Sequence, residues 1–341
     1  MARLATLVGV LACLATPAAG RPVRRPRCTV RLSPHDELQP TIDRVVVSRR
    51  PARVCLDAGE FRLHRFLSLA ADGITLRGEG PSTVLRLAEG VESPVVVVGD
   101  HAKEVPRRVT SNVTIERLRI VGGGPGGSEL HPEYPYLTNS AVVVRAGRGI
   151  VVRDLDVTAC RSACILTEHE SRDVRIEGNR VGDSVWDGIS LNRTARARVA
   201  ENVILGNGAA GITTEHLEDS VIERNVVRAN KTHGLYLSDS YRNTVVGNRF
   251  VDNVLSGVFL TCALHDRTPR PVCWQRSMSQ GNAFVRNEFT ANRVGFTAAP
   301  DAAARCRSPG FVANRSSGDV FRKNPRDEPG PPAYGRCLVF A

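Results

Sequence analysis

The same three side chains, Thr-Glu-His, occur twice in the chain, at residues 167–169 and 214–216. Imidazole and carboxylate groups are the side chains most often used to transfer protons near neutral pH. Between the two triplets lies Arg193, preceded by Asn192. A guanidinium and a side-chain amide can neutralise or hydrogen-bond a developing negative charge. These residue types therefore indicate general acid–base chemistry on an anionic group, provided that the fold brings them together.

A repeat of 23 residues predicts how these side chains are arranged. Asparagines and glycines both recur at this interval, at Asn179, Asn202, Asn225 and Asn248 and at Gly188, Gly211, Gly234 and Gly257. Each unit holds three short runs rich in Val and Ile, separated by polar turns. A fixed period of this length is typical of a solenoid, and the three breaks leave no room for an amphipathic helix. We therefore predict coils of three short strands, each stacked in parallel on the coil below.

Units such as VRIEGNRV followed by DGISL resemble those of the right-handed parallel β-helix superfamily, over residues 36–300. That superfamily includes pectate lyases, polygalacturonases, mannuronan C5-epimerases and NosD-type proteins. The resemblance implies an all-β, single-stranded right-handed parallel β-helix with a core of inward Val, Ile and Leu. It also implies that the repeated asparagines, together with Asn287, stack as a ladder in the turn between the second and third strands. Residues 38–46 are predicted to form a short amphipathic helix that caps the core.

The expected organisation is a signal peptide (residues 1–20), a β-helix with its N-terminal cap (residues 21–305) and a C-terminal tail (residues 306–341). The first segment has one Arg, an apolar run from Leu4 to Leu14 and small residues up to Gly20, which is typical of a cleaved signal. The apolar run is too short to span a bilayer. We expect a secreted or periplasmic monomer without a transmembrane segment. A lipid anchor at Cys13 is the lesser alternative.

Eight cysteines follow the predicted signal peptide, and an even number in an exported chain favours disulfides. Pairing of sequence neighbours predicts the bonds Cys28–Cys55, Cys160–Cys164, Cys262–Cys273 and Cys306–Cys337. The last bond would hold a loop-like, Pro-rich tail over the end of the core. Zinc binding is the alternative, but the spacings lack the paired C-x2-C pattern.

The formal net charge is +11, from 46 Lys and Arg against 35 Asp and Glu. A positive charge of this size favours a polyanionic partner. For an exported protein we expect an acidic polysaccharide and no nucleic acid. An Arg-rich solvated surface without a specific partner would give the same charge.

In a β-helix one rung lies about 4.8 Å above the next, so equivalent positions form columns. The 23-residue register predicts one column of Glu168, Asn192, Glu215 and Ser238, and a second of His169, Arg193, His216 and Asp239. Outward strand-one positions are Ser190, Thr213, Tyr236 and Phe259, and the positions before the glycines are Asp187, Ala210, His233 and Ser256. His169 and His216 would then lie roughly 10 Å apart, with Arg193 between them.

Two insertions are predicted to border these columns, at residues 122–139 and 262–282. The first is rich in glycine and carries Tyr134 and Tyr136, and the second carries Trp274. Loops on a rigid scaffold often bind ligands, and aromatic side chains can stack on sugar rings. These three aromatic residues are therefore candidates for substrate binding.

Abstraction of the C5 proton of a uronate requires a group that neutralises the carboxylate, a base and an acid. Arg193 with Asn192 suits the first role, His216 or His169 the second and Tyr236 the third. Glu215 and Glu168 would orient the histidines or help to bind a calcium ion, the candidate cofactor. The remaining candidates for substrate binding are Asp187, His233 and Asp239. These roles predict a polysaccharide lyase or a uronate C5-epimerase.

Two other functions fit the same sequence. The unit GLYLSDSYRNTVVGNRF resembles those of NosD-type proteins, which favours a non-catalytic carbohydrate-binding or accessory protein. The polar triplets would then be surface residues copied with the repeat. VWDGISL and THGLYL resemble fragments of polygalacturonase motifs, but residues 207–210 read Asn-Gly-Ala-Ala where that family has paired aspartates. Hydrolysis needs two carboxyl groups at a set separation, which makes it the weakest of the three.

Overall fold

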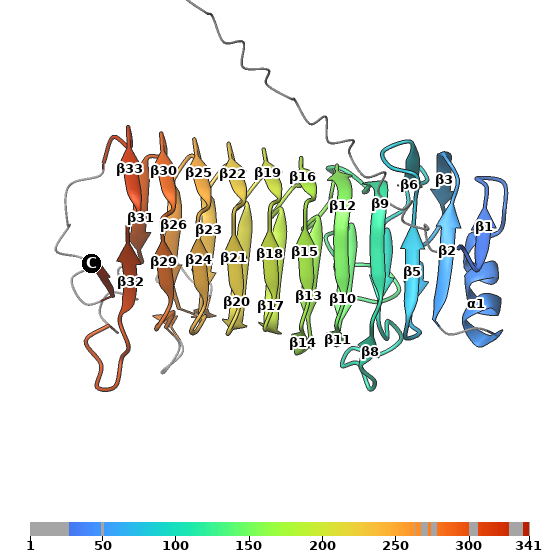
Figure 1. Cartoon of the computed structure of the whole chain (residues 1–341), viewed down its shortest axis with the longest axis horizontal. Coiled ribbons are helices and arrows are strands. Elements are labelled where there is room, and N and C mark those ends of the chain that lie inside the picture. The colour runs from blue at the N-terminus through green and yellow to red at the C-terminus, as the bar shows by residue number, and fades with distance from the viewer. Residues whose placement is uncertain are drawn as a thin grey trace, which may run out of the picture.

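The computed structural model describes residues 27–48, 51–262, 264–266, 272–273, 278–299, 306–326 and 337–340. The predicted signal peptide lies outside these residues. Within them the chain forms one helix, α1 (Leu38–Ser48), and many short strands stacked along one axis (Figure 1). The fold is a right-handed parallel β-helix, as the repeat predicted. No helix among the described residues is long and apolar enough to cross a membrane.

Each coil contributes one strand to each of three parallel faces. The first face, here called the strand-one sheet, consists of β4 (Leu67–Leu69), β7 (Val96–Val98), β10 (Val142–Arg145), β13 (Ile165–Glu168), β17 (Ile189–Ala195), β20 (Ile212–Glu218), β23 (His233–Ser238), β26 (Ser256–Thr261) and β31 (Val294–Ala298). The short strands β8 (Thr110–Ser111), β11 (Gly147–Arg148) and β14 (Ser171–Arg172) extend its edge.

The other two faces share the long strands β9 (Thr114–Val121) and β12 (Val151–Thr158). One face also contains β1 (Val30–Leu32), β2 (Ala52–Leu56), β5 (Ile74–Arg77), β15 (Arg175–Glu177), β18 (Arg198–Ala200), β21 (Val221–Glu223), β24 (Thr244–Val246), β29 (Ala283–Val285), β32 (Asn314–Ser317) and β34 (Leu338–Phe340). The other contains β3 (Gly59–Leu63), β6 (Thr83–Leu87), β16 (Arg180–Gly182), β19 (Val203–Leu205), β22 (Val226–Arg228), β25 (Arg249–Val251), β30 (Glu288–Thr290) and β33 (Val320–Arg322). An antiparallel pair, β27 (Leu264–Asp266) and β28 (Val272–Cys273), lies in the second insertion.

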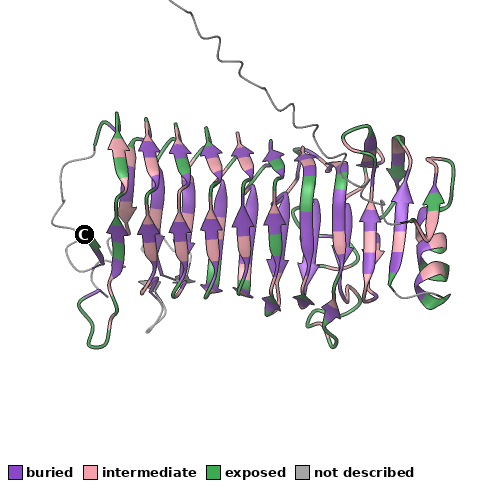
Figure 2. Ribbon diagram, in the orientation of Figure 1, coloured by how far each residue is buried: buried purple, intermediate pink, exposed green. Residues whose placement is uncertain are grey.

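Inward side chains of successive coils stack into one continuous core (Figure 2). On the strand-one sheet, Ile189, Ile212, Leu235 and Val258 are paired in register and fully buried. Alternate residues along each strand point outward, which is the period-two pattern of the sequence. Burial of each such side chain contributes about 1.5–3 kcal/mol.

Buried asparagine side chains form a ladder at each corner of the coil. In the predicted ladder, each amide nitrogen from Asn179 to Asn248 donates to the next asparagine at 2.9–3.0 Å, and Asn287 donates to Asp319. Two further ladders were not predicted. One runs through Asn207, Asn230, Asn253, Asn292 and Asn324. The other runs through Asn243, Asn282 and Asn314. Each ladder satisfies backbone groups that the turns would otherwise bury unpaired.

The predictions for the two ends of the core are confirmed in part. Helix α1 places Leu38, Ile42 and Val46 against the first coils. Three predicted disulfides are present, Cys28–Cys55, Cys160–Cys164 and Cys306–Cys337, whereas the Cys262–Cys273 prediction involves a side chain outside the described residues. The described part of the tail is not loop-like, because β32, β33 and β34 continue the parallel stack.

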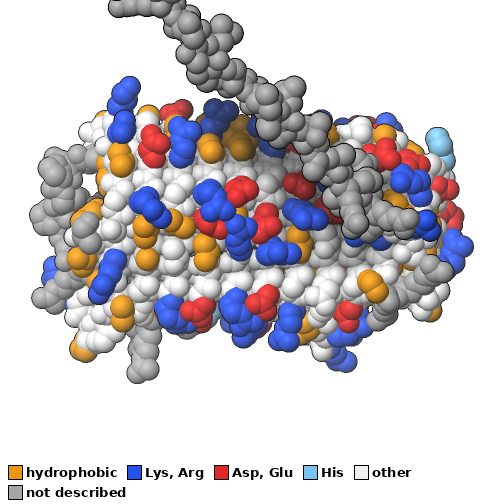
Figure 3. Space-filling model, in the orientation of Figure 1, with side chains coloured by type: hydrophobic (Ala, Val, Ile, Leu, Met, Phe, Trp, Pro, Cys, Tyr) orange, Lys and Arg blue, Asp and Glu red, His pale blue; other side chains and the backbone are white. Residues whose placement is uncertain are grey.

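Charged side chains of both signs lie next to one another over the outside of the stack (Figure 3). Several ion pairs join residues one coil apart, for example Arg196 with Asp173 at 2.7 Å and Arg242 with Asp219 at 2.7 Å. Exposed pairs of this kind contribute little to stability, but they place opposite charges next to one another along each column.

Replacement of Asn225 by Ala tests the ladder. The change removes the acceptor for the backbone and side-chain amides of Asn202 and the donor to the Val199 carbonyl. We expect the free energy of unfolding to fall by about 2–4 kcal/mol, because buried polar groups lose their partners. Chemical denaturation followed by circular dichroism measures the change.

The matched control is Arg224→Ala on the same turn, whose exposed guanidinium pairs with Glu201 and Glu223. This variant is expected to unfold almost as the wild type does. Equal loss of stability in the two variants would contradict a special role for the buried ladder.

Candidate functional site

The strand register places the predicted columns side by side. Asn192 pairs with Glu215 and Glu215 with Ser238, and the pairing of Thr167 with Leu191 sets Glu168 level with Asn192. The second column follows at the end of the strand-one sheet, where His169, Arg193, His216 and Asp239 all have left-handed φ values between 41° and 63°. The common backbone geometry makes these four positions equivalent turns at one edge of the sheet.

His216 is held between two carboxylates. Its Nδ1 lies 3.0 Å from Asp239 Oδ2, and its Nε2 lies 3.1 Å from Glu218 Oε1. Tyr241 packs edge-on against the imidazole and donates its hydroxyl hydrogen bond to Asp239. Burial, followed by the hydrogen bond to Asp239, raises the pKa of Tyr241. The partners of His216 are thus Asp239, Glu218 and Tyr241, and only Asp239 was among the predicted site residues.

His169 belongs to a different cluster, centred on Arg145. This guanidinium is fully buried and contacts Glu168 Oε1 at 2.6 Å and His169 Nε2 at 3.0 Å. It also donates to three backbone carbonyls of residues 100–104 and lies over the ring of Tyr136. Because a guanidinium only donates hydrogen bonds, His169 Nε2 is the acceptor in its contact with Arg145. Arg145 was not among the predicted site residues, although its position after Val142–Val144 in a buried strand was the available signal.

Arg193 lies between these two clusters on the turn column. Its side chain is exposed and forms none of the ion pairs found among the described residues. The imidazoles of His216 and His169 are surrounded by partners, whereas the guanidinium of Arg193 faces solvent. Arg193 is therefore the cation of this edge that is available to an external anion.

Asp187 lies at the opposite edge of the same sheet, at the start of β17. Its Oδ1 accepts a hydrogen bond from the Ala210 amide at 3.0 Å. Burial raises the pKa of this carboxyl to about 6; hydrogen bonds from Ala210 and the Thr213 hydroxyl lower it, and the charges of Glu215 and Glu129 raise it. A carboxyl that titrates near pH 6 can both donate and accept protons under physiological conditions.

The edge that holds Asp187 also carries aromatic side chains. Trp186, which the sequence analysis did not single out, is 49% exposed. His233 stacks on Phe259 with ring centroids 4.5 Å apart, and Tyr236 lies beside both rings. Burial lowers the pKa of His233 to about 4, so its ring is neutral at pH 7. These rings provide flat surfaces of the kind that sugars pack against.

The predicted aromatic residues of the insertions have other positions. Tyr134 and Tyr136 pack on a second apolar cluster that covers the outside of β7, β10 and β13, and the Tyr136 hydroxyl donates to the His101 carbonyl. Trp274 lies outside the described residues. The sheet therefore brings together Asp187, Asn192, Glu215, His233 and Tyr236, with Arg193 and the His216 cluster at one edge.

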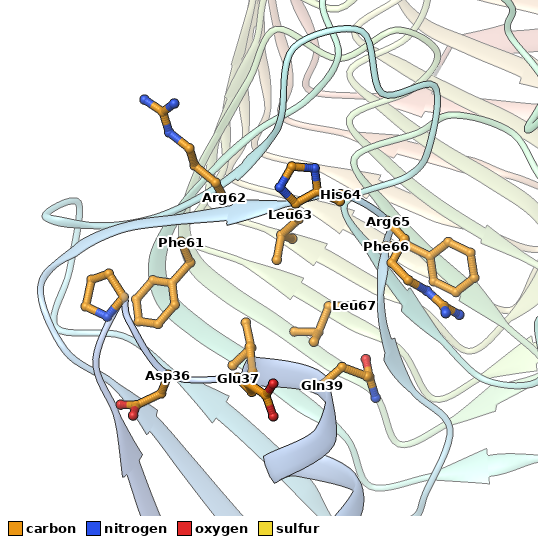
Figure 4. Close-up of a pocket in the computed structure, with 12 residues that line it drawn as sticks. Asp36, Glu37, Gln39, Phe61, Arg62, Leu63, His64, Arg65, Phe66 and Leu67 are labelled. Atoms are coloured by element: carbon orange, nitrogen blue, oxygen red, sulfur yellow. The ribbon is translucent and has the colours of Figure 1, made fainter.

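A cavity of about 240 Å³ lies at the opposite end of the molecule, beside the start of α1 (Figure 4). Phe61, Leu63 and Leu67 form its apolar side, and Arg62, His64 and Asp36 lie around it. None of the predicted site residues lines this cavity. Asp36 is already engaged with the backbone and hydroxyl of Ser33.

Comparison with known proteins identifies a family. The family model described as "Periplasmic copper-binding protein (NosD)" matches residues 112–307. No curated protein sequence matches the chain.

Among solved structures, the chain is similar to the A-module of the Azotobacter vinelandii mannuronan C-5 epimerase AlgE4, with 18% identity and a TM-score of 0.55 over 83% of this chain and 82% of that chain. It is also similar to PfbA, a surface adhesin of Streptococcus pneumoniae, with 12% identity and a TM-score of 0.61 over 89% of this chain and 77% of that chain. At these identities the likeness shows the β-helix fold alone.

The described residues do not fit a copper ion. No group of three or more His, Cys, Asp or Glu side chains among them is placed to hold a metal. Among the described residues, the six cysteines of the three disulfides are bonded and Cys262 is disulfide-bonded as well. Met278 is buried with Cys306 and Cys337. Thiolate and thioether ligands, which suit Cu(I), are thus engaged elsewhere. We derive no step through copper.

Asp187→Asn is expected to stabilise the protein at high pH. The folded-state pKa of about 6 lies above the ordinary value of 3.8, so the folded state favours the protonated carboxyl. Its contribution is complete below pH 3.8 and is lost as the pH rises through 6. Asparagine keeps the acceptor for Ala210 without the charge. The variant should gain roughly 2–3 kcal/mol over the wild type at pH 8 and nothing at pH 3.5, measured by denaturation across pH.

Asp173→Asn is the control of opposite sign. The hydrogen bonds and charge of Arg196 lower the pKa of Asp173, so its loss should weaken the protein at neutral pH. Stabilisation by both substitutions, or by neither, would contradict the burial assigned to Asp187.

Proposed function

The chain belongs to the NosD family of parallel β-helix proteins, and we propose that it is an exported protein that transfers a proton at C5 of a uronate in an acidic polysaccharide. The ligand would lie on the outside of the strand-one sheet from β17 to β26, here called the open face. The three disulfides fit an extracellular protein, and the family is described as periplasmic. The net charge of +11 suits a polyanion.

The observation that carries the proposal is the pairing of two carboxyl groups in different environments across the open face. Asp187 is partly buried with a pKa of about 6, whereas Glu215 is exposed. Asp187 is hydrogen-bonded to Thr213, which lies two residues before Glu215 on β20. Alternate residues on a strand point to the same side, about 6.6 Å apart. The two carboxyls therefore flank Thr213 on one surface, as an acid and a base require.

In the proposed reaction Glu215 removes the C5 proton, and the electron pair of the broken C–H bond delocalises into the uronate carboxylate. Exposed Arg193 neutralises that carboxylate from the edge of the sheet. Asp187, in its protonated form, either returns a proton to the opposite face of C5 or protonates O4 as it leaves. The first outcome inverts C5, and the second forms a C4=C5 double bond.

The remaining predicted residues would act by binding and positioning. Asn192 and Tyr236 lie on the open face, and the neutral ring of His233 extends its aromatic surface. His216 would stay between Asp239 and Glu218 and border the ligand at the edge of the sheet. Lys231, two residues before His233, is exposed and forms no ion pair with any of the described residues. It therefore offers a second cation at the edge that holds Asp187.

Incubation of the purified protein with alginate, pectate and glycosaminoglycans tests this function. Absorbance of unsaturated uronate reports elimination, and NMR in deuterated water reports exchange at C5. We expect one of the two signals, and we expect Asp187→Asn to lower it by at least about 100-fold, as loss of a general acid does. Asp156→Asn, on the neighbouring face in β12, should be neutral.

Other results would redirect the proposal. Activity that survives Asp187→Asn but is lost in His216→Ala would assign the proton transfer to His216. Binding without either signal, unchanged in both variants, would leave a carbohydrate-binding protein.

The pH profile gives an independent check. If protonated Asp187 is the acid, the rate should fall above pH 6, about tenfold for each further pH unit. A rate that continues to rise between pH 6 and 8 would exclude this role.

Hydrolysis of a glycosidic bond is a second candidate, favoured by the same carboxyl pair. Hydrolases that invert configuration hold an acid and a base about 6.5–9.5 Å apart. Glu215 lies about 6.6 Å along the strand from Thr213, the residue that is hydrogen-bonded to Asp187. New reducing ends without unsaturated uronate would establish this reaction instead.

A further inference from the structure

The outward side of the strand-one sheet is covered over its first rungs and open over the later ones. Val97, Val143 and Leu166 occupy successive outward positions, yet they are at most 4% exposed. They form an apolar cluster with Phe66, Leu137 and Ala163, outside the main core. The next outward position, Ser190, is still only 7% exposed, and the positions from Thr213 to Phe259 are partly exposed.

The insertion at residues 122–139, here called the covering loop, makes this difference. Leu137 is fully buried in the cluster, and Tyr134 and Tyr136 pack against it. The covering loop removes the outward Val and Leu side chains of these rungs from water, and their burial lowers the free energy of the folded state. At the same positions the later rungs carry Ser190, Thr213, Tyr236 and Phe259, and the side chains from Thr213 onward are partly exposed.

The covering loop is fixed in place by several contacts. Leu130 bridges Thr138, and the Asn139 amide donates to the carbonyls of Ser128 and Leu130. Tyr136 lies under the buried guanidinium of Arg145. Arg161 donates to the carbonyls of Gly123 and Gly124, where the chain turns. These contacts tie the glycine-rich loop to itself and to the adjoining coils at several points.

The loop ends beside the proposed acid. Glu129 of the covering loop accepts a hydrogen bond from Ser162, and its charge helps to raise the pKa of Asp187. The Asp187 carbonyl accepts from the Cys164 amide, one rung closer to the loop. Asp187 therefore stands at the boundary between the covered and the open rungs.

From this arrangement we infer that the protein binds the end of a polysaccharide chain, with the terminal unit against the covering loop. This inference rests on the proposed function. A polymer that follows the axis of the β-helix can extend over β20, β23 and β26 but not over β13, β10 and β7. Only a terminal unit, or the linkage next to it, can then reach Asp187. The structure thus assigns chain-end specificity to residues 122–139.

The dependence of binding affinity on polymer length tests the inference without requiring catalysis. Uronate polymers and oligomers with a tenfold difference in mean length are compared by calorimetry at equal uronate concentration. If chain ends bind, the shorter set should bind about tenfold more tightly per uronate, because it offers that many more sites. Oligomers blocked at the reducing or the non-reducing end identify which terminus is bound.

Leu137→Asp should detach the covering loop, because it buries an unpaired charge in the outer cluster and leaves the main core intact. In this variant the length dependence should fall from about tenfold to about onefold, as internal units gain access. Leu130→Asp, at a position 41% exposed in the same loop, is the control and should behave as the wild type.

Each result decides a different point. Equal affinity per uronate at all lengths in the wild type would overturn the inference and leave the proposed function standing. Failure to bind any uronate polymer would overturn both. If Leu137→Asp does not fold, the wild-type length series and the end-blocked oligomers still decide.

Discussion

The amide ladders are the constraint on which the rest of the structure depends. A buried asparagine can satisfy its hydrogen bonds only if the next coil presents another acceptor at the same height. The separation of Asn225 and Asn248 is 23 residues and that of Asn248 and Asn287 is 39, yet the side-chain bonds are 2.9 Å and 3.0 Å long. The longer separation therefore leaves the register of the coils unchanged. This permits long insertions beside a site without displacing the strands that carry it.

The same register controls the electrostatics of the surface. Equivalent side chains lie one rung apart, so charges of like sign in one column would repel one another strongly. The turn column from Asp173 through Arg196 and Asp219 to Arg242 alternates in sign, and neighbouring pairs are bonded. His216 is flanked by Asp239 and Glu218, and His169 by Glu168. Arg193 and Asp187 differ from this pattern, since Arg193 forms no ion pair with any of the described residues and Asp187 is a carboxyl near further carboxyls.

Periodicity explains which features could be predicted from the sequence. The β-helix, the first ladder and the level of Asn192 with Glu215 all follow from counting in steps of 23 residues. Helix α1 follows from the amphipathic pattern of residues 38–46. The partners of the histidines do not follow from counting. Arg145 reaches His169 because residues 100–104 fold over its guanidinium, and those residues belong to no repeat. The environment of Asp187 depends in part on Glu129 in an irregular loop, and the outer cluster that holds Tyr134 and Tyr136 depends on the same loop.

A structural role accounts well for most polar groups on the strand-one sheet, but not for Asp187. The asparagine ladders gain hydrogen bonds by burial, and His216 gains two carboxylate contacts. Asp187 loses solvation and lies near two further negative charges, so its ionised form opposes folding at neutral pH. Asparagine would keep the hydrogen bond from Ala210 without that cost. A carboxyl that weakens the fold at a position where an amide would suffice is typical of a site shaped by chemistry, where stability and function oppose each other.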